Sequence, residues 1–348
     1  MKIYHLSHTD LDGYAAQYVA EQYLEGVECL NANYGKEINE KFDEILAKIS
    51  ENFEQNSDEK SLVLITDLNL LPAQCEKFQN LLAEKNGKIL LLDHHQSGAE
   101  CAAKYPWYLL DSSRCATKIT YDFFSAMFGE RAELAKFVRV VNAVDIWLSD
   151  EAEFELGKVC LGMVSAAKEI NKVMFEDESK KYINFLLSKI FEFQNLPEAH
   201  IALDDALHGL KKSFFSSGAN DTLSNHISKY IVNLLSAQKE KFLIDYEGQK
   251  GILTYNIGNV SVIGNEFLLA NPDIDFFIDV TSKKTLSFRA NGKIDVSLMA
   301  KNLLGGGGHV NASGGLFMGF KDANCYEAVK SQIEQLINLK TQRGENES

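Results

Sequence analysis

Aspartates and histidines gather in four short stretches of the sequence, each associated with a run of apolar residues. The stretches are His8-Thr9-Asp10-Leu11-Asp12-Gly13, Asp67, Asp93-His94-His95 and Asp145. Carboxylate and imidazole groups are the ligands that divalent metals of the Mn, Mg and Zn group accept. The apolar runs are strand-like, and α/β sheets bind ligands at the carboxyl ends of their strands. Four such stretches on successive strand ends predict a metal-assisted hydrolase.

Each acidic residue also has a structural alternative. Asp12 could cap the helix that follows it, Asp67 could cap the next helix along the chain, and Asp145 could form a buried ion pair with Arg139 or another basic residue. For Asp145 the residues alone leave metal binding and ion pairing equally open. Asp10 and Asp12 are two residues apart, which on an extended strand end places both side chains on one face. Because close carboxylates repel, we expect a cation between them.

The elements that must position these residues follow from the apolar pattern. In the first half we predict strands over 3–7, 27–31, 62–66 and 88–92, alternating with helices over 12–25, 38–49, 72–84, 117–128 and 133–144. This alternation predicts a parallel sheet with helices on both faces. From 151 to 242 apolar residues recur at three- and four-residue spacing, which indicates helices. Strands return over 251–255, 274–280 and 285–290, and a helix is predicted over 296–304.

The fold class expected from this pattern is therefore α/β in three parts. A parallel-sheet domain covers residues 1–150, a helical connector 151–245, and a smaller α/β domain 246–340.

Four consecutive glycines, Gly305 to Gly308, precede His309 at the end of the last predicted helix. A flexible linker is one interpretation of the glycines, and close approach of backbone N–H groups to an anion is the other. Arg289 suits bidentate recognition of a phosphate, although a surface ion pair is its alternative.

Composition and charge narrow the class of function. The 348 residues are 45% hydrophobic, and 35 basic against 49 acidic residues give a net charge of −14. A binder of long duplex nucleic acid usually has a basic surface, so that class is disfavoured. No apolar run approaches the ~18–20 residues of a membrane helix. Six scattered cysteines without a C-x-x-C pair and an N-terminus without signal-peptide organisation predict a cytoplasmic protein that does not bind a membrane.

Taken in order, the motifs resemble those of the DHH phosphoesterase family. The segment 8–13, Asp67 and the Asp93-His94-His95 triplet resemble its first three motifs, and Asp145 resembles the fourth. The glycine run with His309, followed by 311–315, resembles the signature of the family's usual C-terminal domain. The resemblance covers about residues 1–150 and 250–325, and it is greatest to the B-type oligoribonucleases, or nanoRNases.

The resemblance implies an activity and a set of roles. It implies two divalent metal ions, Mn²⁺ first and Mg²⁺, Fe²⁺ or Zn²⁺ also compatible, with Asp67 as the bridging ligand. The implied metal ligands are His8, Asp10, Asp12, Asp67, His94 and Asp145. His95 is implied to contact the substrate phosphate, and Asp93 to orient a histidine ring. The implied substrate-binding residues are Arg289, Gly306, Gly307, Gly308 and His309. Val310 stands where many relatives have a basic residue, so one cation is missing.

The activity expected from the resemblance is hydrolysis of short single-stranded oligonucleotides to mononucleotides. A phosphodiesterase for cyclic or linear dinucleotides and an adenosine bisphosphate phosphatase are the enzymatic alternatives, since all three would use the same metal site. A nucleotide-binding regulator is the non-enzymatic alternative, and the complete set of acidic residues and histidines disfavours it. Substrate length, RNA versus DNA, and a homodimer are left open by the sequence.

Overall fold

The protein is described here by a computed structural model that covers residues 1–347, with side chains through residue 340. The chain divides into two compact units, which are described separately. The N-terminal unit comprises Met1–Ala167 and Ile183–Leu207, and the C-terminal unit comprises Lys168–Tyr182 and His208–Ser348. The domain boundaries expected near residues 150 and 245 stay predictions.

The N-terminal unit is built on a five-stranded sheet in which every pairing is parallel. Its strands are β1 (Lys2–Ser7), β2 (Val27–Asn31), β3 (Ser61–Thr66), β4 (Gly87–Asp93) and β5 (Tyr108–Leu110), in the spatial order β2-β1-β3-β4-β5. The predicted parallel sheet is confirmed, and only the three-residue β5 was not expected in this sheet. The chain runs from β1 to β2 on one side and then to β3 on the other. The carboxyl ends of β1 and β3 therefore form a topological switch point, where ligands bind in such sheets.

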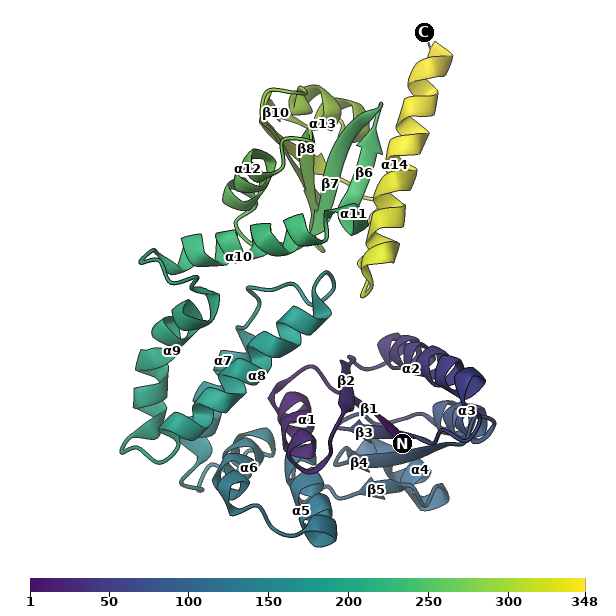
Figure 1. Ribbon diagram of the computed structural model, residues 1–348, viewed down its shortest axis with the longest axis vertical. Coiled ribbons are helices and arrows are strands. Elements are labelled where there is room, and N and C mark those ends of the chain that lie inside the picture. The colour runs from purple at the N-terminus through teal and green to yellow at the C-terminus, as the bar shows by residue number, and fades with distance from the viewer. Residues whose placement is uncertain (348) are drawn as a thin grey trace. The chain divides into compact units, whose positions relative to one another are not determined.

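Helices cover both faces of this sheet (Figure 1). On one face lie α1 (Leu11–Tyr23) and α5 (Ala116–Phe128), with α6 (Ala132–Asp145) against them; on the other lie α2 (Lys36–Gln55), α3 (Pro72–Ala83) and α4 (Ala99–Lys104). Successive side chains of β3 serve the two cores: Val63 and Ile65 pack with Phe42 and Phe78, whereas Leu64 packs on the α1 and α5 side. α2 extends to Gln55, beyond the end predicted at residue 49.

The region predicted to be helical contains five helices. They are α7 (Phe154–Ser165), α8 (Glu176–Phe193), α9 (Ala199–Phe215), α10 (Leu223–Ala237) and α11 (Lys239–Phe242). The division between the two units falls within this region, since α8 contributes residues to both.

The C-terminal unit contains a second, mixed sheet of six strands in the order β10-β11-β9-β8-β7-β6. The strands are β6 (Leu243–Tyr246), β7 (Gln249–Tyr255), β8 (Phe276–Val280), β9 (Thr285–Ala290), β10 (Gly307–His309) and β11 (Ala312–Leu316), and only β7 and β8 pair in parallel. Its remaining helices are α12 (Val260–Ala270), α13 (Val296–Leu304) and α14 (Tyr326–Glu347). The second α/β part is thus confirmed, whereas β6, β10 and β11 were not predicted.

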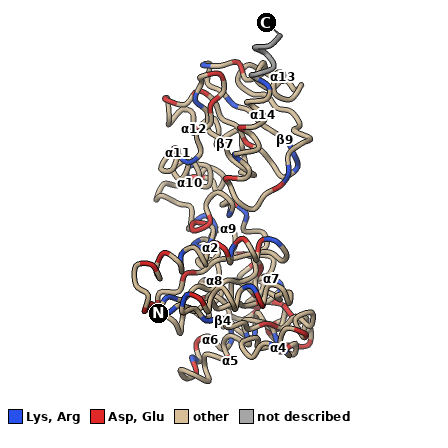
Figure 2. The backbone as a smooth tube through the Cα atoms, turned by 90° about the vertical axis from the view of Figure 1, so that its right-hand side faces the viewer, with Lys and Arg blue, Asp and Glu red and all other residues tan. Residues whose placement is uncertain are grey.

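Charged residues are dispersed along the chain. Figure 2 shows basic and acidic residues interspersed along both units. Among the described residues, no helix combines the length and the apolar character that crossing a membrane requires.

Candidate active site

The first motif folds differently from the extended strand end that its spacing predicted. β1 ends at Ser7 and α1 begins at Leu11, so Asp10 is the N-cap of α1 and accepts a hydrogen bond from Gly13 N at 3.0 Å. Asp12 lies within the first turn and is 1% exposed. The predicted extended geometry is therefore wrong, and the capping role considered for Asp12 belongs to Asp10.

Asp12 is held by the N-terminus of another helix. Its two carboxylate oxygens accept hydrogen bonds from Ala116 N at 2.7 Å and Thr117 N at 2.8 Å, in the first turn of α5. Backbone N–H groups and the helix dipole stabilise a negative charge at this position. The helix therefore fixes where the carboxylate lies.

Asp67 lies between two histidines that come from different strand ends. It follows β3 with a left-handed backbone (φ 57°), is 2% exposed, and does not cap α3, whose N-cap is Leu71. Its Oδ1 is 3.3 Å from His94 Nε2 and its Oδ2 is 3.6 Å from His8 Nδ1. A non-glycine residue with positive φ is uncommon, and such backbone strain concentrates at functional sites. The conformation presents one oxygen to each histidine.

His94 is the point where three carboxylates converge. Besides Asp67, Asp145 Oδ2 lies 3.7 Å and Asp12 Oδ2 lies 3.9 Å from His94 Nε2. Asp145 is the last residue of helix α6, to which the helix predicted over 133–144 leads, and it does not lie at a strand end as the motif pattern suggested. The buried ion pair considered between Asp145 and Arg139 is not formed, because Arg139 pairs with Glu153 at 3.1 Å.

The remaining residues of the triplet form a hydrogen-bonded chain. His95 Nδ1 donates to Asp93 Oδ1 at 2.7 Å, and the Tyr108 hydroxyl donates to Asp93 Oδ2 at 2.6 Å. Asp93 is fully buried at the end of β4. A Cβ at Gly98 would lie 1.9 Å from the Tyr108 hydroxyl oxygen, so only glycine leaves room for this contact. The chain fixes the orientation of the His95 ring.

The charges of the cluster are poorly balanced by protein groups. Burial and the neighbouring Asp12 carboxylate raise the pKa of Asp67 well above its usual range. Burial, followed by Asp12 and Asp67, raises the pKa of Asp145 to about 8. In His8, burial favours the neutral ring, but hydrogen bonds and charge from Asp10 and Asp67 outweigh it and raise the pKa to about 10. Buried carboxylates this close ionise together only when a cation neutralises them.

The donor set fits divalent metal ions. Potential ligand atoms lie within 4.8 Å of one another in three groups: His8, Asp10 and Asp67; Asp67, His94 and His95; Asp12, His94 and Asp145. Asp67 Oδ2 is buried without a hydrogen-bond partner among the described residues. All six residues predicted to bind metal occur in these groups, and none of the groups contains a cysteine. Oxygen and imidazole donors of this kind suit Mn²⁺ and Mg²⁺ better than soft metals.

Two tyrosines of the site were missed by sequence reasoning. The Tyr34 hydroxyl lies 2.8 Å from His95 Nε2, on the side of the ring opposite Asp93, and Tyr108 holds Asp93 itself. Tyr34 lies in the loop after β2 and Tyr108 begins the short β5. Neither residue stands in a motif or an unusual pattern, so the sequence carried no signal for them.

The substrate-binding residues predicted in the C-terminal unit lie on neighbouring strands. Arg289 on β9 and His309 on β10 both pair with Ala312 on β11, so the strand register places all three side chains on one face of the sheet. The Arg289 guanidinium donates to Ser261 Oγ at 2.8 Å and to Phe288 O at 2.7 Å. This pairing brings two potential cations within about two strand spacings of each other, roughly 10 Å.

The glycine run is ordered structure, and the flexible-linker interpretation is wrong. Gly305 caps α13 in a left-handed conformation, and Gly307 and Gly308 belong to the edge strand β10. A Cβ at Gly306 would lie 2.2 Å from Gly314 O, so the close backbone packing of the hairpin requires glycine there. Among the three predicted anion-binding glycines, only Gly307 faces open space.

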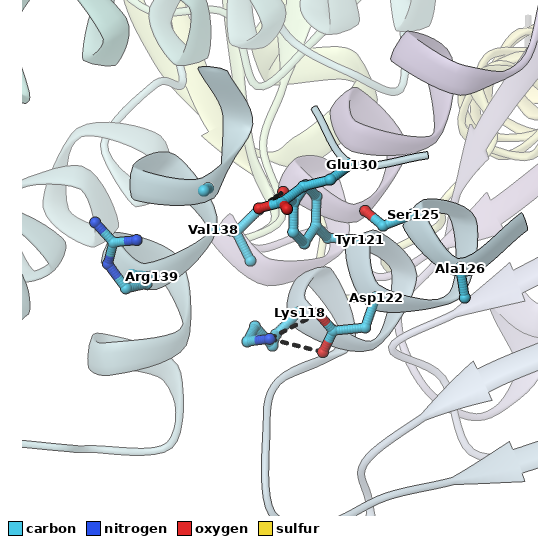
Figure 3. A pocket seen from close by; sticks show the side chains of 9 residues that line it. Lys118, Tyr121, Asp122, Ser125, Ala126, Glu130, Val138 and Arg139 are labelled. Carbon is cyan, nitrogen blue, oxygen red and sulfur yellow. Dashed lines mark hydrogen bonds and ion pairs between the residues drawn. The ribbon is translucent and has the colours of Figure 1, made fainter. Parts of the chain in front are cut away.

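A separate pocket lies between α5 and α6 in the N-terminal unit (Figure 3). Its volume is about 490 Å³, and its walls include Lys118, Tyr121, Glu130 and Arg139. Lys118 is paired with Asp122 there, as Figure 3 shows. We call the three groups of potential metal ligands together the acidic cluster: His8, Asp10, Asp12, Asp67, His94, His95 and Asp145. None of the residues that line this pocket belongs to it.

Comparison with known proteins defines the family. No protein-family model matches the chain. A curated protein of Helicobacter pylori (strain ATCC 700392 / 26695), named 3',5'-cyclic-nucleotide phosphodiesterase, is 41% identical over 349 residues, which cover 97% of this chain and 99% of the relative. The chain belongs to the DHH phosphoesterase family. It is a phosphoesterase of the hydrolase class, and enzymes of this family depend on metal ions.

Two solved structures resemble the chain to different degrees. The crystal structure of an uncharacterised protein from Helicobacter pylori G27 matches with a TM-score of 0.89 and 41% identity, covering 97% of this chain and 99% of that one. The DHH domain of a protein assigned to a family of ribosomal proteins is more distant, at 13% identity and a TM-score of 0.37, with coverage of 96% and 87%. The Helicobacter structure therefore shares the fold described above.

Proposed function

We propose that this phosphoesterase hydrolyses the phosphodiester bond of small nucleotides with two divalent metal ions, and that 3',5'-cyclic nucleotides are its first substrates. The observation that carries the two-metal assignment is Asp67, whose two oxygens face His8 and His94 separately. Asp67 would therefore help to hold both ions. The cyclic-nucleotide assignment is supported by the relative of that name, which aligns over 97% of the chain.

The six clustered residues provide ligands for both ions. We assign His8 and Asp10 to one ion, Asp12, His94 and Asp145 to the other, and Asp67 to both. When bound, such ions polarise a phosphate oxygen and lower the pKa of water so that a nucleophile forms near neutral pH. We propose Mn²⁺ as the physiological ion because the donors are oxygen and imidazole only.

The protein's own groups bind and orient the phosphate. Asp93 accepts the Nδ1 proton of His95, so Nε2 is the ring nitrogen turned toward the acidic cluster. Tyr108 keeps Asp93 in place and thereby keeps the ring from rotating. We assign His95 to stabilisation of the charge that develops on the phosphate, a role that requires a proton on Nε2 as well as on Nδ1. We assign Arg289, His309 and the Gly306–Gly308 backbone to binding the rest of the nucleotide, as the family resemblance implies.

Short single-stranded oligonucleotides are the second candidate. The order of the motifs and the glycine run with His309 favour them, because this combination resembles the B-type oligoribonucleases. The net charge of −14 repels a long polyanion more than a short one. If oligomers are cleaved, we expect release of mononucleotides from a free end and no cutting of a circular single strand of plasmid length.

A substrate panel tests these assignments. The purified protein is incubated with Mn²⁺ and 3',5'-cyclic mononucleotides, cyclic dinucleotides, RNAs of two to ten nucleotides or adenosine bisphosphate, and the products are resolved by length. We expect the highest kcat/KM for cyclic mononucleotides and production of nucleoside monophosphates. Preference for oligomers would make the second candidate the function, and absence of turnover on every phosphodiester would refute the proposal.

A further inference from the structure

Tyr34 stands at the edge of the acidic cluster and contacts both of its outer histidines. Its ring centroid is 4.7 Å from that of His8 and 5.5 Å from that of His95. Its hydroxyl lies 2.8 Å from His95 Nε2 and 3.4 Å from the carbonyl oxygen of Asp67. The residue is 43% exposed. Tyr34 therefore faces solvent and the acidic cluster at once.

The loop that carries Tyr34 is tied to the first motif. Thr9 precedes Asp10 in the chain, and its Oγ1 donates to Asn33 Oδ1 at 2.6 Å. Glu37 Oε2 accepts from both the backbone N and the side-chain Nδ2 of Asn33, at 3.0 and 2.7 Å. A tyrosine next to such an anchored residue keeps a defined position relative to the cluster.

An anionic phosphate in this cluster needs hydrogen-bond donors as well as metal ions. When ionised, the clustered carboxylates accept hydrogen bonds but cannot donate them. The Nδ1 proton of His95 is already used by Asp93, so it cannot serve the phosphate. The Tyr34 hydroxyl carries one proton, which donates either to His95 Nε2 or to another acceptor nearby. Rotation about the bond between the ring and the hydroxyl oxygen redirects this proton without moving the ring.

We propose that Tyr34 is a substrate-binding residue whose hydroxyl donates to a non-bridging oxygen of the phosphodiester, beside His95. The proposal rests on the function proposed above for this cluster. In the free protein the hydroxyl hydrogen-bonds with His95. A phosphate oxygen at hydrogen-bond distance from the hydroxyl would accept this proton in place of His95 Nε2, which lies 2.8 Å from the hydroxyl oxygen.

Tyr34→Phe tests the proposal because it removes only the hydroxyl and keeps both ring contacts. Hydrogen bonds to charged groups are worth enough to change affinity by about tenfold or more. We expect KM for the best substrate of the panel to rise by about tenfold, with metal stoichiometry unchanged. Tyr23→Phe is the matched control. Tyr23 is the last residue of α1, whereas Asp12 lies in its first turn, and the hydroxyl that is removed lies 2.9 Å from Ser125 Oγ. The control should match the unsubstituted protein.

Binding of inorganic phosphate gives a second readout that does not depend on turnover. Calorimetry with the metal-loaded protein should show about tenfold weaker phosphate binding in Tyr34→Phe and no change in Tyr23→Phe. KM and phosphate affinity both within about twofold of the unsubstituted protein would overturn the role of Tyr34, as would loss of a metal ion. If no phosphodiester is hydrolysed but Tyr34→Phe still weakens phosphate binding, the proposed function fails and the anion-binding role of Tyr34 stands.

Discussion

Metal should reverse the order of thermal stability between Asp67→Asn and the unsubstituted protein. Without metal the variant should melt at the higher temperature, and with metal at the lower. The substitution keeps the shape of the side chain and removes its charge. In the metal-free protein Asp67 is buried beside Asp12, which raises its pKa well above the usual range. Such a group holds its proton more tightly in the folded state, so the protein loses stability as the pH rises above the unfolded-state pKa of about 3.9. Asparagine does not ionise and so causes no such loss of stability. The metal-free variant should therefore melt at a higher temperature than the metal-free unsubstituted protein near pH 7.5.

Metal binding acts in the opposite direction. A ligand at one hundred times its dissociation constant stabilises the folded state by about 2.7 kcal/mol. For a domain of about 150–250 residues this corresponds to a rise in Tm of roughly 5–10 °C. Asp67 belongs to two of the three potential ligand groups, so its loss weakens both metal positions. The variant should gain only a small part of this rise, and its turnover should nearly vanish.

Differential scanning calorimetry with chelator and then with Mn²⁺ measures both effects. Asp58→Asn is the control, because Asp58 is an exposed aspartate of the same unit outside the acidic cluster. It should show the full response to Mn²⁺. A variant at position 67 that gains as much Tm from Mn²⁺ as the unsubstituted protein, or keeps turnover within about tenfold of it, would refute the bridging role.

Three further outcomes test other parts of the molecule. Exhaustive chelation should abolish turnover and Mn²⁺ should restore it best; full activity in protein shown to be metal-free would contradict the metal site. Arg289→Ala and His309→Ala should each lower kcat/KM by about tenfold at unchanged metal stoichiometry, and calorimetry that showed a lost metal ion would contradict their assignment to the nucleotide. Burial raises the pKa of Asp279 to about 7, despite hydrogen bonds from Thr254 and Ile257. The folded protein therefore binds the extra proton, and its stability should fall as pH rises from about 4 to about 7, by on the order of 4 kcal/mol. Asp279→Asn should remove this contribution, so its free energy of unfolding, measured by urea denaturation, should fall less steeply with pH than that of the unsubstituted protein, and equal slopes would contradict it.

The sequence was sufficient for the features that depend on local patterns. The alternation of apolar runs predicted the parallel sheet, because strands and helices have different side-chain periods that are written along the chain. β1 to β4 and the helix over Val296–Leu304 were located within a few residues. β10 and β11 were missed because strands rich in glycine lack the β-branched and aromatic residues that mark a strand.

The residues of the acidic cluster could be named from the sequence, but the elements that bring them together could not. The chain order of strands does not state their spatial order, and the switch point between β1 and β3 appears only when the sheet is formed. Asp145 is brought in by helix α6 instead of a strand, and Asp12 is placed by the N-terminus of α5, more than one hundred residues away.

What the sequence determined by itself is the chemistry available: carboxylates and imidazoles in four motifs, with a parallel sheet to carry them. What only the tertiary structure decided is the geometry. The left-handed backbone of Asp67 turns one oxygen to each of two histidines, and the loop at Tyr34 and the strand at Tyr108 hold His95 and Asp93 in position. These contacts join segments up to 61 residues apart. Their physical origin is the packing of separate strand ends and loops against one another, which no local pattern of residues encodes.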